Sequence, residues 1–366
     1  MDPLPTAYCR LPTADCLLDW VIRRIEPLPL ARPGPLNLIT DVAGLTVGNA
    51  EDRRIVTGVT VVVPAKPTVA AVEQRGGAPG TRETDALDPV AYVDEIHAIV
   101  LAGGSVFGLD AASGVTSALA ARGIGFRYGT QPIPCPVVPA AILFDLMNGG
   151  DKDFAAAPPY HELGRRALAA AATAFDLGNA GAGLGAIAGR LKGGLGSASI
   201  VLEDLTVGAL VAVNSHGSAV NPATGALWAE PFRIGDEFGH VQDHARATPG
   251  HPVWAGTKRE AAMIAAGENT TIAVVATDAA LTKAETRRLA IMAADGLARA
   301  IRPVHSPFDG DTVFAVATAA RPLTEPRAVT LAALGTLAAD ALARAVGRAL
   351  WESTAIPGWP AYQPSR

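Results

Sequence analysis

The sequence predicts a layered domain of the α/β or α+β class, in which helices pack outside β-strands. Strand-like and helix-like segments alternate from residue 36 onward. Several strand segments are apolar almost throughout, as in TGVTVVVP (57–64) and TTIAVVAT (270–277). Such runs are typical of a sheet that is covered on both faces. Composition agrees, because 49% hydrophobic and 18% charged residues can bury a sizeable core.

The remaining elements follow from the same patterns of apolar residues. Further strands are expected at residues 68–72, 98–102, 197–202, 207–213 and 312–318. Helices are expected at about 105–121, 161–174, 282–301 and 326–351, and residues 169–177 also have a helical pattern. Thr282 followed by Glu285 matches a capping box at the start of one helix, and Pro326 suits the first turn of another.

The first 36 residues contain seven prolines. They are expected to form an irregular extension (1–36) ahead of a single domain at 37–366. No signal peptide and no membrane-spanning run of about 18 apolar residues is expected. Three cysteines without a C-x-x-C pattern argue against a disulfide framework or a zinc site. Free thiols fit the reducing cytoplasm, which is the expected location.

Charge and aromatic content bear on possible partners. The formal net charge is −5, no basic run stands out, and aromatic residues make up 5% of the chain. A nucleic-acid partner is therefore not expected.

The segment GENTTIAVV (267–275) carries the most chemistry. A strained peptide bond before a threonine can be attacked by that threonine's hydroxyl, and water then hydrolyses the ester. A cut between Asn269 and Thr270 would leave Thr270 with a free α-amine beside its hydroxyl. That amine titrates at about pH 8, so it could serve as the local base. An ordinary turn before a strand explains the same residues, so the segment alone leaves both interpretations open.

Three further polar residues could complete such a site. Asn214 ends an apolar strand, and an amide placed there suits the stabilisation of an oxyanion. Asp309 and Asp311 are two residues apart and would point the same way in extended backbone, toward the amine and hydroxyl of Thr270. The alternatives are a turn asparagine and an acidic turn. A divalent-metal site has less support, because no third ligand is fixed nearby in the sequence.

Two glycine-rich turns would let a ligand or another segment approach closely. One spans residues 181–197 and contains Arg190 and Lys192, and the other is Gly103–Gly104 after a short strand. The phosphate-loop pattern G-x-x-x-x-G-K-[ST] is absent, and the segment before the first turn has a helical pattern. A nucleotide cofactor is therefore not expected.

Six segments, taken in order, resemble one family. They are AIVLAGGSVFGLDAASGV (98–115), GAGLGAIAGR (181–190), KGGLGSAS (192–199), VAVNSHG (211–217), GENTTIAVVATD (267–278) and FDGDTVFAVAT (308–318). The family is that of the DmpA-type aminopeptidases and their relatives, the nylon-oligomer (6-aminohexanoate oligomer) hydrolases. Each motif is weak alone, but their order and spacing over about residues 36–325 are specific.

The resemblance implies an α+β fold, the αββα sandwich of N-terminal-nucleophile hydrolases. It implies self-cleavage into an α-chain (1–269) and a β-chain (270–366) that stay associated. A homo-oligomer is implied as well, with a tetramer favoured, and no metal or organic cofactor is required. The Asn-Thr-Thr form is similar to the nylon-oligomer branch, since the aminopeptidase branch typically has a serine nucleophile.

Residue roles carry over by position. Thr270 would be the nucleophile and Asn269 the residue before the cut. Asn214 would stabilise the oxyanion, and Asp309 and Asp311 would orient the amine and hydroxyl of the nucleophile.

The sequence departs from the nylon-oligomer hydrolases at two positions. Arg190 stands where those enzymes have a lysine, and arginine does not deprotonate to act as a base. Lys192, two residues on, could take its place. Phe144 stands where they have a tyrosine, so a hydroxyl donor is missing from the expected substrate site, to which Gly103 and Gly104 would also belong.

The expected function is hydrolysis of short aliphatic amide oligomers or small peptides through an acyl-enzyme on Thr270. One alternative is an aminopeptidase acting on peptides or amino-acid amides. Another is an acyltransferase like the ornithine acetyltransferases, which would pass the acyl group to an amine instead of water. A third is a non-catalytic binding protein of the same fold, in which the bond between Asn269 and Thr270 would stay intact.

Overall fold

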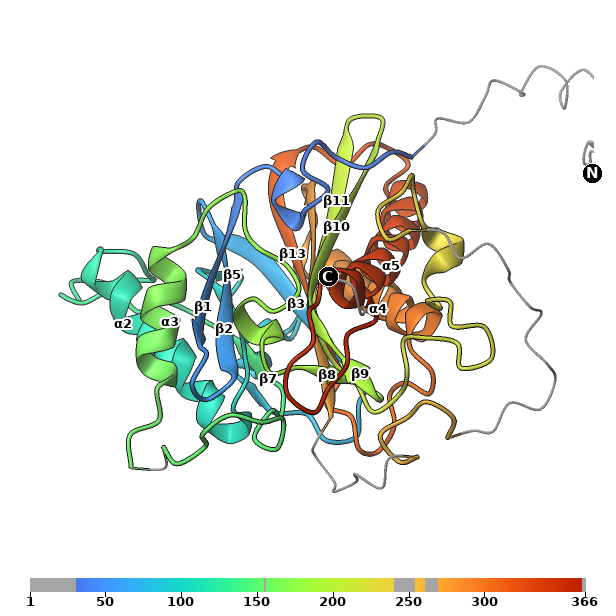
Figure 1. Ribbon diagram of the computed structural model, residues 1–366. Coiled ribbons are helices and arrows are strands. Elements are labelled where there is room, and N and C mark those ends of the chain that lie inside the picture. Colours follow the sequence, from blue (N-terminus) through green and yellow to red (C-terminus); the bar gives the residue numbers. More distant parts are fainter. Residues whose placement is uncertain (1–30, 155, 240–253, 261–268, 364–366) are drawn as a thin grey trace, which may run out of the picture.

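Two β-sheets lie face to face, and each is covered on its outer side by a pair of α-helices (Figure 1). The computed structural model describes residues 31–154, 156–239, 254–260 and 269–363. Within them, α2 (Asp110–Ala121) and α3 (Tyr160–Ala169) cover one sheet, while α4 (Lys283–Ala300) and α5 (Arg327–Trp351) cover the other. The predicted αββα sandwich is therefore confirmed.

The six-stranded sheet carries the segments that matter for the site. Its strands, in spatial order, are β10 (Gly194–Leu202), β11 (Leu205–Asn214), β12 (Thr270–Ala279), β13 (Thr312–Arg321), β3 (Thr68–Gln74) and β5 (Glu95–Ile96). All neighbours are antiparallel except β12 and β13, which run parallel. Helix α4 makes the crossover that this parallel pair requires.

The five-stranded sheet packs face to face against the six-stranded sheet. Its strands, in spatial order, are β1 (Leu45–Asp52), β2 (Thr57–Pro64), β6 (Ile99–Ala102), β7 (Ala140–Ile142) and β4 (Thr81–Arg82). A small ribbon of β8 (Ile187–Ala188) and β9 (Leu191–Lys192) lies next to β11. Short 3-10 helices occur at Ile39–Asp41, Thr84–Leu87, Ser105–Leu109, Gly181–Gly183 and Glu230–Phe232.

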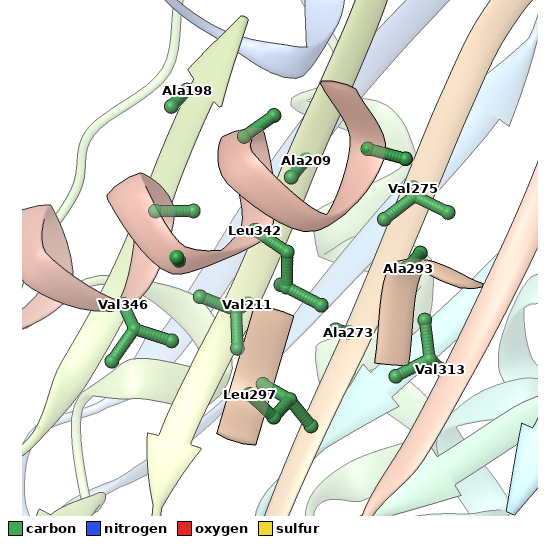
Figure 2. Close-up of a cluster of buried hydrophobic side chains, with 14 of the residues drawn as sticks. Ala198, Ala209, Val211, Ala273, Val275, Ala293, Leu297, Val313, Leu342 and Val346 are labelled. Carbon is green, nitrogen blue, oxygen red and sulfur yellow. The ribbon is translucent and has the colours of Figure 1, made fainter. Parts of the chain in front are cut away.

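Strand β12 is apolar from Ile272 to Ala276 because both of its faces are buried there. Ile272 and Val274 lie in the core between the two sheets, whereas Ala273 and Val275 lie in the core under α4 and α5. Figure 2 shows Ala273 and Val275 in one cluster of buried side chains with Leu342 of α5. Side chains alternate between faces along a strand, so a central strand of a sandwich needs an apolar residue at every position.

Helix α5 approaches the sheet closely because the strand beneath it has a glycine. A Cβ on Gly196 of β10 would overlap the carbonyl oxygen of Ala345. Gly296 of α4 is in the same situation against Ala339 of α5. At these two glycines backbone therefore lies against backbone, which lets α5 approach both the sheet and α4 closely.

Helix α5 is the one helix in the described ranges that is long and apolar enough to cross a membrane, judged by length and composition alone. Its most apolar window has a mean hydropathy of 1.5, and 56% of that window is buried inside the protein. Its buried residues pack against α4, β10 and β11. A core helix has these properties too.

The helical pattern at residues 169–177 is a wrong prediction, and so is the extension of the preceding helix to residue 174. Helix α3 ends at Ala169, and Ala172 then exchanges backbone hydrogen bonds of 2.9 and 3.0 Å with Val47. Val47 lies on β1, which is an edge strand of its sheet. Pairing with this open edge outweighs the helix propensity of the alanine run.

The proline-rich extension lies mostly outside the described residues. At its end, Arg32 exchanges backbone hydrogen bonds of 3.1 and 2.7 Å with Val201 of β10. This part of the extension is therefore attached to the outer edge of the six-stranded sheet.

Leu342→Ala tests the packing of α5 on the sheet. Leu342 is fully buried in the core of Figure 2, so its truncation should leave a cavity and cost about 2–5 kcal/mol of unfolding free energy. Urea denaturation would measure the loss. Val329→Ala is the control on the same helix, because Val329 is 65% exposed and should change stability by less than about 0.5 kcal/mol. Equal costs for both variants would contradict this packing.

Candidate active site at the ends of β11, β12 and β13

Strand register brings the predicted site residues together at one end of the six-stranded sheet. Asn214, the last residue of β11, is the pairing partner of Thr270, the first residue of β12. On the other side, Asn269 forms a parallel bridge with Asp309, shortly before β13. All four residues are buried. A motif at 211–217, one at 267–278 and one at 308–318 thus meet at the bond between Asn269 and Thr270.

The hydroxyl of Thr270 lies against the peptide bond that precedes it. Its Oγ1 donates a hydrogen bond to the carbonyl oxygen of Asn269. The same oxygen accepts a second hydrogen bond, of 2.9 Å, from the backbone N–H of Gly310. A Cβ on Gly310 would lie 2.7 Å from Thr270 Oγ1 and 2.6 Å from the oxygen of Ala78. Only glycine therefore leaves room for the hydroxyl in this position.

Asp309 is held by three donors. Its Oδ1 accepts from the backbone N–H of His216 at 3.0 Å, and its Oδ2 accepts from the N–H and the hydroxyl of Ser306 at 3.1 and 2.5 Å. Burial first, and then the negative charge of Asp311, raise the pKa of Asp309 to about 6. This carboxylate therefore changes its charge close to neutral pH.

Asp311 contacts the residue that follows the expected nucleophile. Its Oδ1 accepts a hydrogen bond of 2.8 Å from the backbone N–H of Thr271. Its Oδ2 accepts from the backbone N–H of His305 at 3.0 Å and lies 2.8 Å from His305 Nδ1. Asp311 thus fixes the start of β12 through a backbone amide, and its role in orienting the amine and hydroxyl of Thr270 stays a prediction.

The amide of Asn214 has a defined orientation. Its Oδ1 accepts from the N–H of Ile187 at 2.9 Å and from Asn148 at 3.3 Å, and its Nδ2 donates to the carbonyl oxygen of Phe144 at 2.9 Å. Because the N–H of Ile187 can only donate, it assigns oxygen and nitrogen in this amide. Phe144 therefore contacts the site through its backbone carbonyl. Its phenyl ring carries no hydroxyl that could replace the tyrosine hydroxyl of the nylon-oligomer hydrolases.

Lys192, and not Arg190, is the buried cation of the glycine-rich segment. The side chain of Arg190 is 59% exposed and pairs with Glu260 at 3.5 Å. Lys192 is fully buried, and its ammonium donates to the carbonyl oxygens of Gly183, Ala186 and Gly193 at 2.8, 2.9 and 3.1 Å. Burial lowers the pKa of Lys192 to about 7. The sequence predicted that another segment or a ligand could approach these glycines closely. In the structure, the backbone of the glycine-rich segment surrounds the ammonium group of Lys192.

Gly103 and Gly104 pack against a buried carboxylate. The N–H of Gly104 donates to Asp145 Oδ1 at 2.9 Å, and a Cβ on Gly103 would overlap Asp145 Oδ2. A Cβ on Gly104 would overlap the ring of Tyr160. Complete burial raises the pKa of Asp145. These contacts account for both glycines, and their role in binding substrate stays a prediction.

Four residues around the site were not singled out from the sequence. They are His216, Lys258, His305 and Ser306. His216 and the His305–Ser306 pair lie within five residues of predicted site residues, which was the only available signal. Lys258 had none, since it reaches the site from a separate segment. It is buried, and its Nζ lies 3.4 Å from Asn214 Oδ1.

Unpaired buried polar atoms gather at this end of the sheet. In the part of the chain that the structure describes, nine buried side-chain nitrogen or oxygen atoms have no hydrogen-bond partner. Six of them belong to four residues of the site: His216 Nδ1 and Nε2, Asn269 Nδ2 and Oδ1, Thr271 Oγ1 and His305 Nε2. Buried polar atoms are almost always paired, so this concentration marks a place where a polar ligand or water belongs.

Comparison with known proteins agrees with the geometry. The model of peptidase family S58 matches residues 37–362. An uncharacterized aminopeptidase of Mycobacterium tuberculosis is 43% identical over 350 residues, which cover 90% of this chain and 97% of that protein. A 6-aminohexanoate-oligomer endohydrolase of Kocuria sp. is 31% identical over 302 residues, covering 80% of this chain and 78% of that protein.

Solved structures share the fold. A β-aminopeptidase of Burkholderia sp. matches with a TM-score of 0.62 at 24% identity, over 93% of this chain and 94% of that one. The L-aminopeptidase D-Ala-esterase/amidase of Ochrobactrum anthropi, described as a variant of the Ntn hydrolase fold, matches with a TM-score of 0.62 at 22% identity over 89% of each chain. The chain therefore belongs to peptidase family S58 and is a hydrolase of amide or peptide bonds, built on the N-terminal-nucleophile hydrolase fold.

Proposed function

We propose that the chain cuts itself between Asn269 and Thr270, and that the freed Thr270 is the nucleophile of an amidohydrolase. One observation carries the proposal. The Thr270 hydroxyl contacts the carbonyl of Asn269, and the N–H of Gly310 holds the same carbonyl oxygen. A nucleophile on one side and a donor on the oxygen are what an attack on this carbonyl requires.

The cut would proceed in two steps. Thr270 Oγ1 bonds to the carbonyl carbon of Asn269, the C–N bond breaks, and the hydroxyl proton moves to the departing amine. This leaves an ester between the two residues. Water then hydrolyses the ester to the carboxylate of Asn269 and the hydroxyl of Thr270. The N–H of Gly310 would stabilise the oxyanion in both steps.

Turnover would repeat this chemistry on a substrate. The α-amine of Thr270 takes the proton of Oγ1, which attacks the substrate carbonyl, and the amine later gives that proton to the leaving group. Asn214, the pairing partner of Thr270, would donate a hydrogen bond from Nδ2 to the oxyanion. The ionised Asp309 would balance the charge of the ammonium form. Water resolves the acyl-enzyme on Oγ1.

The proposed substrates are short aliphatic amide oligomers or small peptides. The endohydrolase relative named above acts on 6-aminohexanoate oligomers. The more similar mycobacterial relatives are named aminopeptidases, and this favours N-terminal trimming of peptides or amino-acid amides as a second candidate. An oligomer with a blocked N-terminus separates the two, because only an endohydrolase can cut it.

The two pieces would stay associated after the cut. Arg344 of α5 is completely buried and binds Glu237 through two hydrogen bonds of 2.6 Å. It also donates to the oxygen of Ser199 and to Asn37 Oδ1 at 2.7 and 2.9 Å. All three partners precede residue 269, so this network joins the future chains.

Association into a homo-oligomer and a cytoplasmic location are also proposed, the latter because Cys135 is an exposed free thiol.

Thr270→Ala should abolish both self-cleavage and hydrolysis. Intact mass under denaturing conditions would show one full-length chain instead of pieces ending at Asn269 and starting at Thr270. Thr318→Val is the matched control, since it removes a buried threonine hydroxyl toward the other end of β13 but keeps the shape. That variant should be cut like the wild type. Activity retained in Thr270→Ala would exclude Thr270 as the nucleophile.

Asn214→Ala should lower turnover by about 10²–10³-fold, the usual cost of losing one oxyanion donor. The rate constant is measured on protein that has already been cut. Asn221→Ala is the control, because the one side-chain hydrogen bond of Asn221 within the described residues is accepted from the N–H of Ala223 in a turn. A loss below about threefold in Asn214→Ala would return Asn214 to a structural role.

The rate of self-cleavage should rise with pH through about 6, because the ionised Asp309 stabilises the positive charge that develops on the Thr270 amine. In Asp311→Asn the neighbouring negative charge is gone, so the pKa of Asp309 falls and this limb of the profile moves to lower pH. Asp278→Asn, at the far end of β12, removes another buried carboxylate and should leave the limb in place. An unmoved limb in Asp311→Asn would contradict the coupling.

A further inference from the structure

His305 has an unusual position beside the site. It precedes Asp311 by six residues, and both its backbone N–H and its Nδ1 face the same oxygen, Asp311 Oδ2, at 3.0 and 2.8 Å. Asp311 is 2% exposed, and its other oxygen accepts from the N–H of Thr271. An ionised carboxylate only accepts hydrogen bonds, so Nδ1 of His305 carries a hydrogen.

The backbone of His305 is in the left-handed region, with φ of 55°. Residues with a Cβ avoid this region, and their presence there usually has a local cause. Here the conformation turns the backbone N–H and the ring toward one carboxylate oxygen together. The opposite ring nitrogen, Nε2, is buried without a hydrogen-bond partner. The ring thus has one polar contact among the described residues, and that contact is Asp311.

Ser306, the residue after His305, binds Asp309 as His305 binds Asp311, with its backbone and its side chain on one carboxylate oxygen. Ser306 donates to Asp309 Oδ2 through both its backbone N–H and its hydroxyl. Asp309, Gly310 and Asp311 are therefore held from one side by the His305–Ser306 pair. The N–H of Gly310 between them binds the carbonyl of Asn269. A rotation of the Asp311 side chain would break its hydrogen bond to the amide of Thr271.

We infer that His305 is a positioning residue for the nucleophile: its imidazole holds Asp311 in the orientation that fixes the start of β12 at Thr271. This inference rests on the proposed role of Thr270. His305 acts through Asp311 and does not touch the substrate. Removing the ring should therefore slow the chemical steps, while the affinity for substrate stays the same.

Glycine and asparagine at position 305 separate the ring from the backbone. Glycine adopts a positive φ freely and asparagine tolerates it, so neither substitution strains the turn. His305→Gly removes the side-chain donor to Asp311. His305→Asn keeps an N–H donor on a short side chain that can reach the same oxygen. Glu203→Gly is the matched control, because Glu203 also has a positive φ (54°) but is exposed at the turn between β10 and β11.

The experiment measures the first-order rate of self-cleavage by intact mass, and kcat and KM of the cut enzyme on a short peptide amide. Urea unfolding of each variant is measured in parallel. His305→Gly should lower the cleavage rate and kcat by about 10–100-fold with KM unchanged, as expected when the alignment of reacting groups is lost. His305→Asn should recover to within about threefold of the wild type. Glu203→Gly should match the wild type.

Two results would overturn the inference alone. In one, His305→Gly cuts itself and turns over like the wild type. In the other, the losses in His305→Gly and His305→Asn simply follow their losses of stability, which indicates a structural role. A wild-type chain that remains whole at Asn269–Thr270 would instead overturn the proposed function, and the inference with it.

Discussion

The pairing of β12 between β11 and β13 is the constraint on which the rest of the site depends. Strand β11 runs antiparallel to β12, and β13 runs parallel to it. The last residue of β11 and the first residues of β12 and β13 therefore meet at the same end of the strands. A shift of one residue in either ladder would separate Asn214 from Thr270 or Gly310 from the carbonyl of Asn269. Register is protected because β12 alternates between two filled cores.

The buried charged groups near this end of the strands, two aspartates and a lysine, are each surrounded by hydrogen-bonding groups. Asp309 and Asp311 are buried side by side, and their repulsion contributes to the raised pKa of Asp309. Three backbone N–H groups, the backbone N–H and hydroxyl of Ser306 and the imidazole of His305 together satisfy both carboxylates. The side chain of Lys192 is held separately, by hydrogen bonds to three carbonyl oxygens. A carboxylate solvated by dipoles keeps its charge available for a positive group that forms nearby during the reaction.

Much of the fold was predictable because apolar periodicity and capping residues are local signals. The capping box of Thr282 and Glu285 forms as predicted, with the N–H of Glu285 donating to Thr282 Oγ1. The alanine-rich stretch after Ala169 was not predictable, because an edge strand far away in sequence decides its conformation. For the site, the sequence predicted the segments around Thr270, Asn214 and Asp309, and the structure brings these segments together. It could not identify Lys258, which only tertiary structure brings close to Asn214.

The central position of β12 and β13 has a consequence for the lifetime of the protein. These strands lie between β11 and β3, both of which precede residue 269 in the chain. If the proposed cut is made, unfolding releases two separate molecules, and refolding requires them to meet again in solution. Recovery then becomes concentration-dependent, and at low concentration it loses to aggregation or proteolysis. The lifetime of the cut enzyme would therefore be set by its rate of unfolding, and not by the equilibrium between folded and unfolded protein.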